Sequence, residues 1–385
     1  MWYAGSMRTP CTGRALVLGA ILGFFGCGDG DSKPTPRERW SAVEAEAWYA
    51  GQPWIVGANF VPSTAVNQLE MWQADTYDEP TIDRELGWAA DLGFNTMRVF
   101  LHDLVYEADP GGFLDRIDRF LAVADRHEIR IMFVLFDGVW NPFPVAGPQP
   151  DPIEHVHNSQ WVQSPGAEIL GDLERHDELE PYVTEVIGRF QSDRRVLAWD
   201  LFNEPDNPNL ISYLEVELPA AVKAPAAEAL LRKAFAWARS VGPTQPITAG
   251  VWQGEWEDPA ALSPLNQLML SESDVVSFHS YARAEVVAEL LTDLRQYGRP
   301  LLCTEYLARS GGSTFQTILP IFEAEGVGAY NWGLVSGRTQ TIYSWISWVT
   351  MDPAAADPWF HDVFYPDGTP YDPEEAALIR QLTDR

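Results

Sequence analysis

The stretch VLAWDLFNEP, from Val196 to Pro205, decides how the chain is expected to fold. Its first seven residues form an almost unbroken apolar run, which is typical of a strand buried on both faces. The run then ends on Asn203 and Glu204, and Pro205 follows. A carboxylate at the end of a buried strand is either a polar cap or a functional group, and the other strands must decide between the two.

Similar runs recur after residue 50 and alternate with longer amphipathic segments. The segment TIDRELGWAADLG (81–93) spaces its apolar residues by three or four positions and ends on Gly93, a plausible helix C-cap. GFLDRIDRFLAVADRHE (112–128) keeps its apolar residues on one face, and the segments 229–242 and 284–298 behave likewise. The eight predicted strands are 54–60, 95–101, 129–136, 196–203, 246–252, 274–281, 299–306 and 327–334.

Eight strand–helix units predict a (β/α)8 barrel that forms a single domain over residues 46–385. The alternative, a doubly wound open sheet, usually has a glycine-rich phosphate turn after its first strand. The first predicted strand instead ends within GANFVPS (57–63), which contains no such turn. A barrel gathers its functional side chains at the carboxyl ends of its strands.

The N-terminus is predicted to direct export. Arg8 and Arg14 precede the apolar run ALVLGAILGFF (15–25), so residues 1–27 are interpreted as a secretory signal. Gly26-Cys27 resembles a lipoprotein cleavage box, which would make Cys27 a lipidated residue. A simply secreted protein and a mis-assigned start codon remain alternatives. Residues 28–45 are predicted to be a flexible tether, and any membrane association is expected only through the lipid anchor or leader.

Composition narrows the range of partners. The formal net charge of -29 repels phosphate backbones and anionic surfaces, so nucleic acid is not an expected partner. Neutral partners are unaffected, and the 16 tryptophans suit the apolar C–H faces of sugar rings. Only Cys303 lies in the main body of the chain, which excludes a disulfide within the barrel and a zinc site built on cysteines.

Polar and aromatic residues gather at the predicted strand ends. They are Arg98 on the second strand, Asp137 and Trp140 after the third, Asn203 and Glu204 after the fourth, Trp252 after the fifth, His279 and Tyr281 on the sixth, Glu305 on the seventh and Trp332 on the eighth. Glu204 and Glu305 would face each other across a barrel. Such a pair of carboxyl groups is what glycoside cleavage requires.

Together, these motifs resemble one enzyme family. FNEP (202–205) with TEY (304–306), and with His-x-Tyr (279–281), resembles the retaining glycoside hydrolases of the cellulase-like family 5 group. The stretch HNSQWVQSPG (157–166) is similar to bacterial cellulase-family and endo-xylanase-like proteins. The resemblance spans residues 50–385 and implies a (β/α)8 fold.

The resemblance also implies roles for individual residues. Glu204 would be the general acid/base and Glu305 the nucleophile. The other implied roles are a contact to the sugar 2-hydroxyl from Asn203, support of ionised Glu305 by Arg98 and Tyr281, and sugar contacts from His279 and Trp332. Trp140, Trp161 and Trp252 are candidates for further subsites.

Three features depart from the family pattern or extend it. Asp137 stands where the family usually has a sugar-binding histidine, so its predicted contact to substrate would have different chemistry. The long segment 138–180 is interpreted as a lid or a subsite wall, and its histidines fit no standard metal-ligand motif. Arg338, after the eighth strand, is predicted to reach over the mouth as a further substrate contact. No metal or other cofactor is expected.

The predicted function is that of a retaining β-glycosidase acting on an oligo- or polysaccharide. Its carboxyl groups should then lie about 5–5.5 Å apart. A catalytically inactive, carbohydrate-binding surface protein on the same barrel is the alternative. A barrel aldolase would need a lysine for a Schiff base, and the eight predicted strands contain none.

Overall fold

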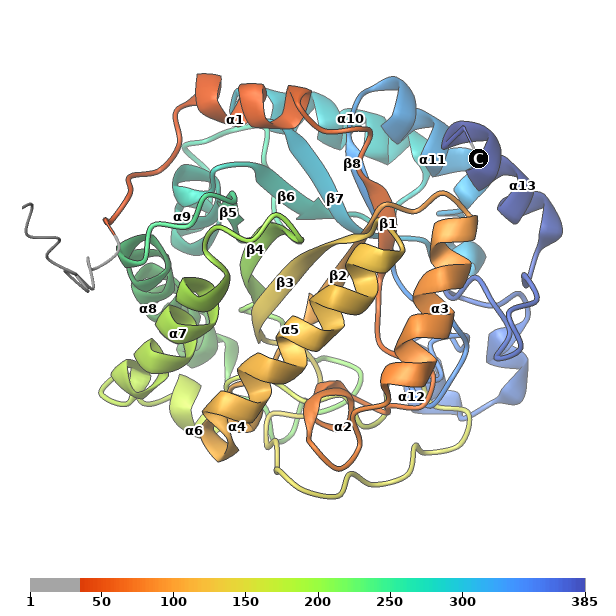
Figure 1. The fold of residues 1–385 in the computed structure, drawn as a ribbon, viewed down its shortest axis with the longest axis horizontal. Coiled ribbons are helices and arrows are strands. Elements are labelled where there is room, and N and C mark those ends of the chain that lie inside the picture. The colour runs from red at the N-terminus through yellow and green to blue at the C-terminus, as the bar shows by residue number, and fades with distance from the viewer. Residues whose placement is uncertain (1–34, 385) are drawn as a thin grey trace, which may run out of the picture. The chain divides into compact units, whose positions relative to one another are not determined.

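The computed structural model describes residues 35–384, and eight parallel strands run through this part of the chain (Figure 1). The strands are β1 (Val56–Asn59), β2 (Thr96–Phe100), β3 (Arg130–Asp137), β4 (Val196–Asn203), β5 (Ile247–Thr248), β6 (Val276–His279), β7 (Leu301–Tyr306) and β8 (Gly328–Asn331). Their order in the sheet is β5-β4-β3-β2-β1-β8-β7-β6. A parallel bridge between Val251 and Phe278 joins the two edges, so the predicted (β/α)8 barrel is confirmed.

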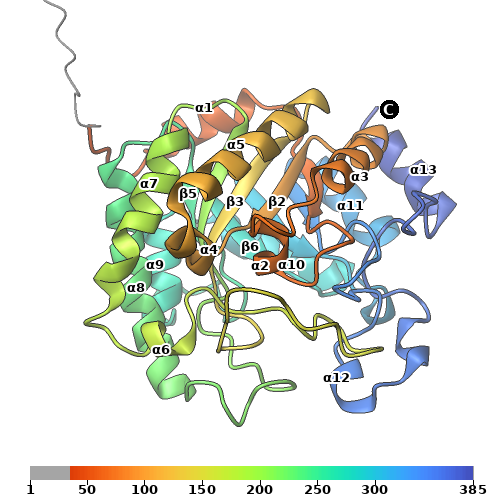
Figure 2. The ribbon, with the colours of Figure 1, turned by 60° about the horizontal axis from the view of Figure 1, so that its bottom comes forward.

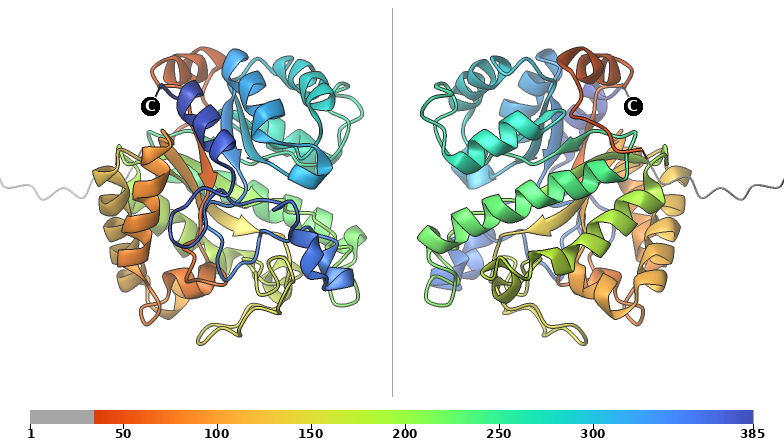
Figure 3. Two further views of the ribbon diagram at one scale, coloured as in Figure 1. Left: turned by 90° about the vertical axis from the view of Figure 1, so that its right-hand side faces the viewer. Right: turned by 90° about the vertical axis from the view of Figure 1, so that its left-hand side faces the viewer.

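The longer helices surround the strands on the outside of the barrel (Figures 1 and 3). The α-helices of the described residues are α1 (Ala42–Ala50), α2 (Gln68–Trp72), α3 (Glu79–Asp91), α4 (Asp103–Ala108), α5 (Pro110–Arg126), α6 (Ala167–Leu170), α7 (Glu180–Phe190), α8 (Ala220–Ser240), α9 (Pro264–Glu272), α10 (Ala284–Arg295), α11 (Phe315–Ala324), α12 (Ser347–Thr350) and α13 (Pro373–Leu382). Within residues 35–384, no helix has the length and apolar character that crossing a bilayer requires.

Capping residues and the spacing of apolar residues determine where the longer helices form and which face they bury. Asp109 begins α5 by accepting a hydrogen bond from the Gly112 amide, and Pro110 occupies the first turn. The apolar residues that were predicted to share one face of this helix are all buried against the barrel. The chain leaves α3 through Gly93, whose φ of 91° lies in the left-handed region that glycine adopts most readily.

The fifth strand is shorter than predicted. Only Ile247 and Thr248 pair with β4, whereas a strand over 246–252 was expected. The chain leaves the ladder after Thr248 and rejoins the sheet at Val251, whose amide donates to the Ser277 carbonyl at 3.1 Å. The seam between β5 and β6 is therefore closed by isolated hydrogen bonds and not by a regular ladder.

Helix α1 covers the amino-terminal end of the barrel. Ala45 of α1 belongs to a cluster of buried residues at or just before the starts of strands, including Ile55, Leu197 and Val275. Figure 1 shows α1 at the top of the view, while the long loops that follow the strands gather at the bottom. The amino-terminal end of the barrel is thus filled by protein.

The prediction of a flexible tether over residues 28–45 is wrong for the part that the structure describes. The Arg37 guanidinium donates to Asp274 at 2.5 Å and to the carbonyls of Pro243 and Gln245. Ser41 then caps α1 through a reciprocal capping box with Glu44. Arg39 donates to the carbonyls of Ser273 and Leu270, so Arg37 and Arg39 together attach this segment to the barrel. The predicted signal and Cys27 lie outside the described residues.

The loops after β3, β4 and β8 lie together at the carboxyl-terminal end of the barrel (Figure 2). The register of the sheet decides which side chains lie next to each other at this end of the strands. Asp137 pairs with Asn203 across β3 and β4, and His279 pairs with Glu305 across β6 and β7. The latter pairing follows a register shift after Phe278, an irregularity of the kind that re-aims side chains near functional sites.

The close approach of β1 and β2 yields a prediction about stability. A Cβ atom added at Gly57 would lie 1.8 Å from the Thr96 carbonyl oxygen, so Gly57→Ala must force the two strands apart. We expect a loss of about 4 kcal/mol or more in the free energy of unfolding, measured by urea denaturation. Gly111→Ala, in the first turn of α5 with open space around it, is the control and should change that free energy by less than about 1 kcal/mol. Equal effects of the two substitutions would contradict this explanation.

Candidate active site

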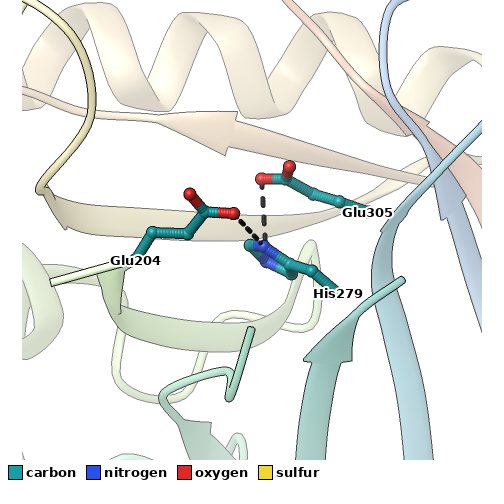
Figure 4. Close-up of side chains that lie close together, drawn as sticks. All are labelled: Glu204, His279 and Glu305. Carbon is teal, nitrogen blue, oxygen red and sulfur yellow. Dashed lines mark hydrogen bonds and ion pairs between the residues drawn. The ribbon is translucent and has the colours of Figure 1, made fainter. Parts of the chain in front are cut away.

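Two glutamates meet at the carboxyl-terminal end of the barrel. Glu204 directly follows β4, Glu305 lies in β7, and their side chains converge on His279 at the end of β6 (Figure 4). The nearest carboxylate oxygens of the two residues lie within 4.8 Å of each other. Glu204 is 9% exposed and Glu305 5%, so both carboxyl groups are largely removed from water.

His279 lies between the two carboxyl groups. Its Nδ1 is 2.7 Å from Glu204 Oε1, within hydrogen-bond distance, while its Nε2 is 3.6 Å from Glu305 Oε1, too long for a hydrogen bond. Burial lowers the pKa of the imidazole to about 4. The ring is therefore neutral near pH 7 and carries one proton that it can share with one neighbour.

The surroundings of Glu204 disfavour its charged form. Its carboxyl accepts a hydrogen bond from Asn207 Nδ2 at 2.6 Å, and none of its described hydrogen-bond partners is an arginine or a lysine. Burial raises the pKa of Glu204 to about 7. Its backbone φ of 39° is unusual for a residue with a side chain, and such strained conformations concentrate at functional sites.

Glu305 is surrounded differently. Arg98 Nη1 donates to its Oε1 at 2.8 Å, and the Tyr281 hydroxyl donates to its Oε2 at 2.7 Å. Burial raises the pKa of Glu305 above its ordinary value, whereas the positive charge of Arg98 and the hydrogen bond from Tyr281 lower it. Of the two carboxyl groups, only that of Glu305 therefore has a direct cationic partner.

Arg98 organises the floor beneath both glutamates. Its buried guanidinium donates to Asp200 through Nε and Nη2, and also to the side-chain oxygens of Asn59 and Asn203. Sequence reasoning placed Arg98 and Asn203 in the site but missed Asp200. The signal was present, because a buried arginine needs carboxylate partners and Asp200 interrupts an otherwise apolar strand.

A cavity of about 380 Å³ opens above the glutamates. Both glutamates line it together with Asn203 and Tyr281. Aromatic side chains form much of the rest of its wall, namely Trp140, Trp161, Trp252, Trp332 and Trp345. A largely apolar cavity with a few converging polar groups is the usual form of a small-molecule site. All four tryptophans that were predicted as sugar contacts thus lie in one cavity.

The long segment after β3 forms one wall of this cavity, as predicted. It is joined to the loop after β8, since Trp140 stacks on Trp348 at 5.4 Å and His157 Nδ1 lies 2.8 Å from the Tyr343 carbonyl. His155 is likewise bonded to the Tyr343 hydroxyl. These histidines therefore bind the two loops together.

One group of side chains could hold a metal ion among the described residues. Glu204, His279 and Glu305 each direct one ligand atom toward the others. Arg98, however, already supplies a positive charge to Glu305, and a metal ion would have to displace the contact between His279 and Glu204. The three residues fit proton transfer better than they fit metal binding.

Comparison with known proteins identifies the family. A family model described as Cellulase (glycosyl hydrolase family 5) matches residues 61–338. This chain belongs to glycosyl hydrolase family 5. The resemblance inferred from FNEP, His-x-Tyr and TEY is confirmed, and the family 5 chain is a glycosidase. A search of curated protein sequences gives no match.

Solved structures confirm the barrel of the family 5 chain. A GH5_18 variant from Streptomyces cattleya in complex with Manb1-4GlcNAc shares 14% identity at a TM-score of 0.59, over 86% of this chain and 80% of that one. The exo-beta-1,4-mannosidase Op5Man5 from Opitutaceae bacterium strain TAV5 shares 19% at 0.57, over 92% and 62%. The endo-beta-1,4-mannanase from Thermotoga petrophila shares 15% at 0.55, over 87% and 77%. At these identities the likeness concerns the fold.

The family 5 barrel places Asp137 beneath the cavity and not in it. Asp137 is 1% exposed, and its oxygens accept hydrogen bonds from Asn203, Trp161, Gln68 and the Val139 amide. Burial raises its pKa to about 6. The predicted contact between Asp137 and substrate is therefore wrong in this structure. Its carboxyl instead orients Asn203 and Trp161, two side chains that do line the cavity.

Arg338 was also predicted to contact substrate, and the structure places it elsewhere. Its guanidinium pairs with Glu70 at 3.3 Å and with Asp151 at 3.1 Å. It does not line the cavity that holds the glutamates. An arginine in a polar loop of a strongly acidic protein readily finds carboxylate partners, which sequence reasoning did not weigh. Arg338 therefore connects the loop after β8 to two neighbouring segments.

Lys223 of α8 supports the loop that carries Glu204, and sequence reasoning missed it because it lies on a helix. Its buried ammonium group donates to the carbonyls of Gly138 and Asn207 at 2.8 and 2.7 Å and to Glu217 at 2.8 Å. Asn207 in turn donates to Glu204. A lysine within the alanine-rich stretch AAVKAPAAEA (220–229) was the available signal.

Lys223→Met tests this support. The substitution leaves Glu217 buried without its counter-charge, so we expect a loss of about 3–5 kcal/mol in the free energy of unfolding, measured by urea denaturation. Lys233→Met is the matched control, because Lys233 lies on the same helix but forms an exposed ion pair with Asp177. The control should lose less than about 1 kcal/mol. Similar losses in both variants would show that Lys223 has no special supporting role.

Proposed function

We propose that this family 5 glycosidase is a retaining β-glycosidase in which Glu305 is the nucleophile and Glu204 the acid/base. One observation carries the proposal. Two carboxyl groups lie within 4.8 Å of each other at their nearest oxygens, and only Glu305 is paired with a cation. Inverting enzymes hold their carboxyl groups about 6.5–9.5 Å apart to admit a water molecule, whereas retaining enzymes hold them about 5–5.5 Å apart.

The unequal surroundings assign the two roles. Glu305, held by Arg98 and Tyr281, is the ionised group that attacks the anomeric carbon. Glu204, with a pKa near 7, carries the proton that passes to the leaving oxygen as the glycosidic bond breaks. Before the reaction, the protonated Glu204 carboxyl donates to the neutral imidazole of His279. The other ring nitrogen of His279 then bears the proton that faces Glu305.

The second step reverses the roles in a way that balances the protons. The Glu204 carboxylate left by the first step takes a proton from a water molecule, whose oxygen attacks the glycosyl–Glu305 ester at the anomeric carbon. The Glu305 carboxylate is released and Glu204 is again protonated. Asn203 is placed to contact the sugar 2-hydroxyl, since one hydrogen of its amide is bonded to Asp137 and the other remains available to the cavity.

The lining of the cavity supports a proposal for the substrate class. We propose an oligo- or polysaccharide with neutral sugars, because the cavity has an aromatic wall and two carboxyl groups. Two of the structural neighbours are an exo-beta-1,4-mannosidase and an endo-beta-1,4-mannanase, so β-mannosides join β-glucosides and β-xylosides among the substrates to test. We further propose that residues 1–27 direct export, with Cys27 as the lipid attachment site.

Substitution of the two glutamates tests the mechanism. Hydrolysis of 4-nitrophenyl β-mannoside, β-glucoside and β-xyloside is measured for wild type, Glu305→Ala and Glu204→Ala. We expect each substitution to lower kcat/KM by about 10²–10⁴-fold or more on the substrate that wild type prefers. Azide should restore turnover to Glu204→Ala with an activated leaving group, giving the β-glycosyl azide.

Glu255→Ala is the control, since Glu255 is exposed and should not affect the rate. A product of inverted configuration, observed by NMR at early times, would contradict the double-displacement mechanism. Binding of glycans without any hydrolysis by the wild-type protein would favour the inactive carbohydrate-binding alternative.

The pH dependence of kcat/KM gives an independent test. Glu204 must be protonated to act as an acid, so activity should be present below its pKa of about 7 and lost as the pH rises through that value. Glu305 must be ionised, so activity should also fall on the acid side. The hydrogen bond from Asn207 lowers the pKa of Glu204, and Asn207→Ala should therefore move the alkaline limb to higher pH. An alkaline limb that stays in place in this variant would argue against Glu204 as the acid.

A further inference from the structure

Asn158, in the loop after β3, is a buried residue that the proposed mechanism does not use. Its φ of 47° lies in the left-handed region, which asparagine tolerates better than most residues. Its backbone amide donates to the Thr339 carbonyl at 2.8 Å, and its carbonyl accepts from the Trp161 amide at 3.0 Å. The loops after β3 and β8 thus fix the position of this residue.

The carboxamide of Asn158 has no partner of its own. The residue is 1% exposed, yet neither Oδ1 nor Nδ2 has a hydrogen-bond partner within residues 35–384. The polar side chains next to it are bonded, since His157 Nδ1 lies 2.8 Å from the Tyr343 carbonyl and Ser159 Oγ accepts from the Ile153 amide. A buried amide with both of its polar atoms unpaired, between two neighbours whose side chains are bonded, calls for an explanation.

The position of Asn158 supplies that explanation. It lines the same cavity as Glu204 and Glu305, and it also lines a small second cleft that shares Trp161 and Trp332 with that cavity. The loops after β4 and β5 carry Glu204 and Trp252, so they face the leaving group that Glu204 protonates. The wall that contains Asn158 and Trp332 therefore faces the glycone, which is the sugar that stays bound to the enzyme.

We propose that Asn158 determines specificity by binding two neighbouring hydroxyl groups of the sugar on the glycone side, an inference that rests on the proposed glycosidase function. The carboxamide offers one acceptor and two donors in one plane, which matches a vicinal diol in which one hydroxyl donates and the other accepts. Trp161 and Trp332 line the same cavity and supply apolar surface to it. The ligand is a neutral pyranose whose diol is free of substituents.

The test uses Asn158→Gly, because glycine adopts a φ of 47° without strain and removes the unpaired amide. Gln160→Ala is the matched control, since Gln160 lies on the same loop, outside the cavity, and its side-chain amide donates to the Asp151 carbonyl. Relative kcat/KM values for the 4-nitrophenyl β-mannoside, β-glucoside and β-xyloside are compared in both variants. We expect Asn158→Gly to change the ratio between the best and second-best substrates by at least about fivefold. Gln160→Ala should leave it unchanged.

Binding is measured separately from turnover. Quenching of tryptophan fluorescence by mannobiose, cellobiose and xylobiose is recorded in a Glu305→Gln background, which prevents hydrolysis. We expect Asn158→Gly to raise the dissociation constant of the best-bound disaccharide by at least about fivefold. Its thermal midpoint should stay within about 3 °C of that of the parent protein, because no protein hydrogen bond is lost.

The outcomes separate this inference from the proposed function. If no glycoside is hydrolysed but Asn158→Gly still weakens disaccharide binding, the function fails and the inference stands. Unchanged ratios together with unchanged binding would overturn the inference. A uniform fall in activity toward all substrates, with a lowered thermal midpoint, would also overturn it, since it would show a purely structural role. Failure of the parent protein to bind any of the three disaccharides would overturn it as well.

Discussion

A single guanidinium group, buried at the centre of the barrel, sets the electrostatics of the whole site. Arg98 is removed from water and must be neutralised by the residues around it. Asp200 balances its charge from below, and Glu305 balances it from above. Because Asp200 has no contact with the cavity, it holds the arginine in place and leaves Glu305 as the partner that faces the substrate.

The same interaction explains why two chemically identical side chains behave differently. Glu204 is buried, though slightly less deeply than Glu305, and it contacts an amide and a neutral imidazole instead of a cation. Burial therefore dominates its pKa, which rises to about 7. A neutral His279 between the carboxyl groups avoids a third charge in a small, poorly solvated space. The different neighbours of the two glutamates thus support the roles proposed for them, proton carrier for Glu204 and anion for Glu305.

Sequence reasoning predicted the barrel and the two glutamates because their signals are local. Eight apolar runs, alternating with amphipathic segments, are visible without knowledge of tertiary contacts. Asp137 and Arg338 were misplaced for the opposite reason: their partners come from segments distant in sequence, such as Trp161 and Glu70. Lys223 and Asn158 were overlooked as functional candidates because burial, and not residue type, gives them their importance.

The attachment of α1 and Arg37 to the amino-terminal end of the barrel has a consequence for handling the protein. Arg37 contacts the segments that lead into β5 and β6, and the carboxyl pair lies at the other ends of the strands. A support or a fused partner joined through this end of the barrel would leave the mouth of the cavity directed away from it. The cavity of the immobilised enzyme should therefore remain accessible from solution.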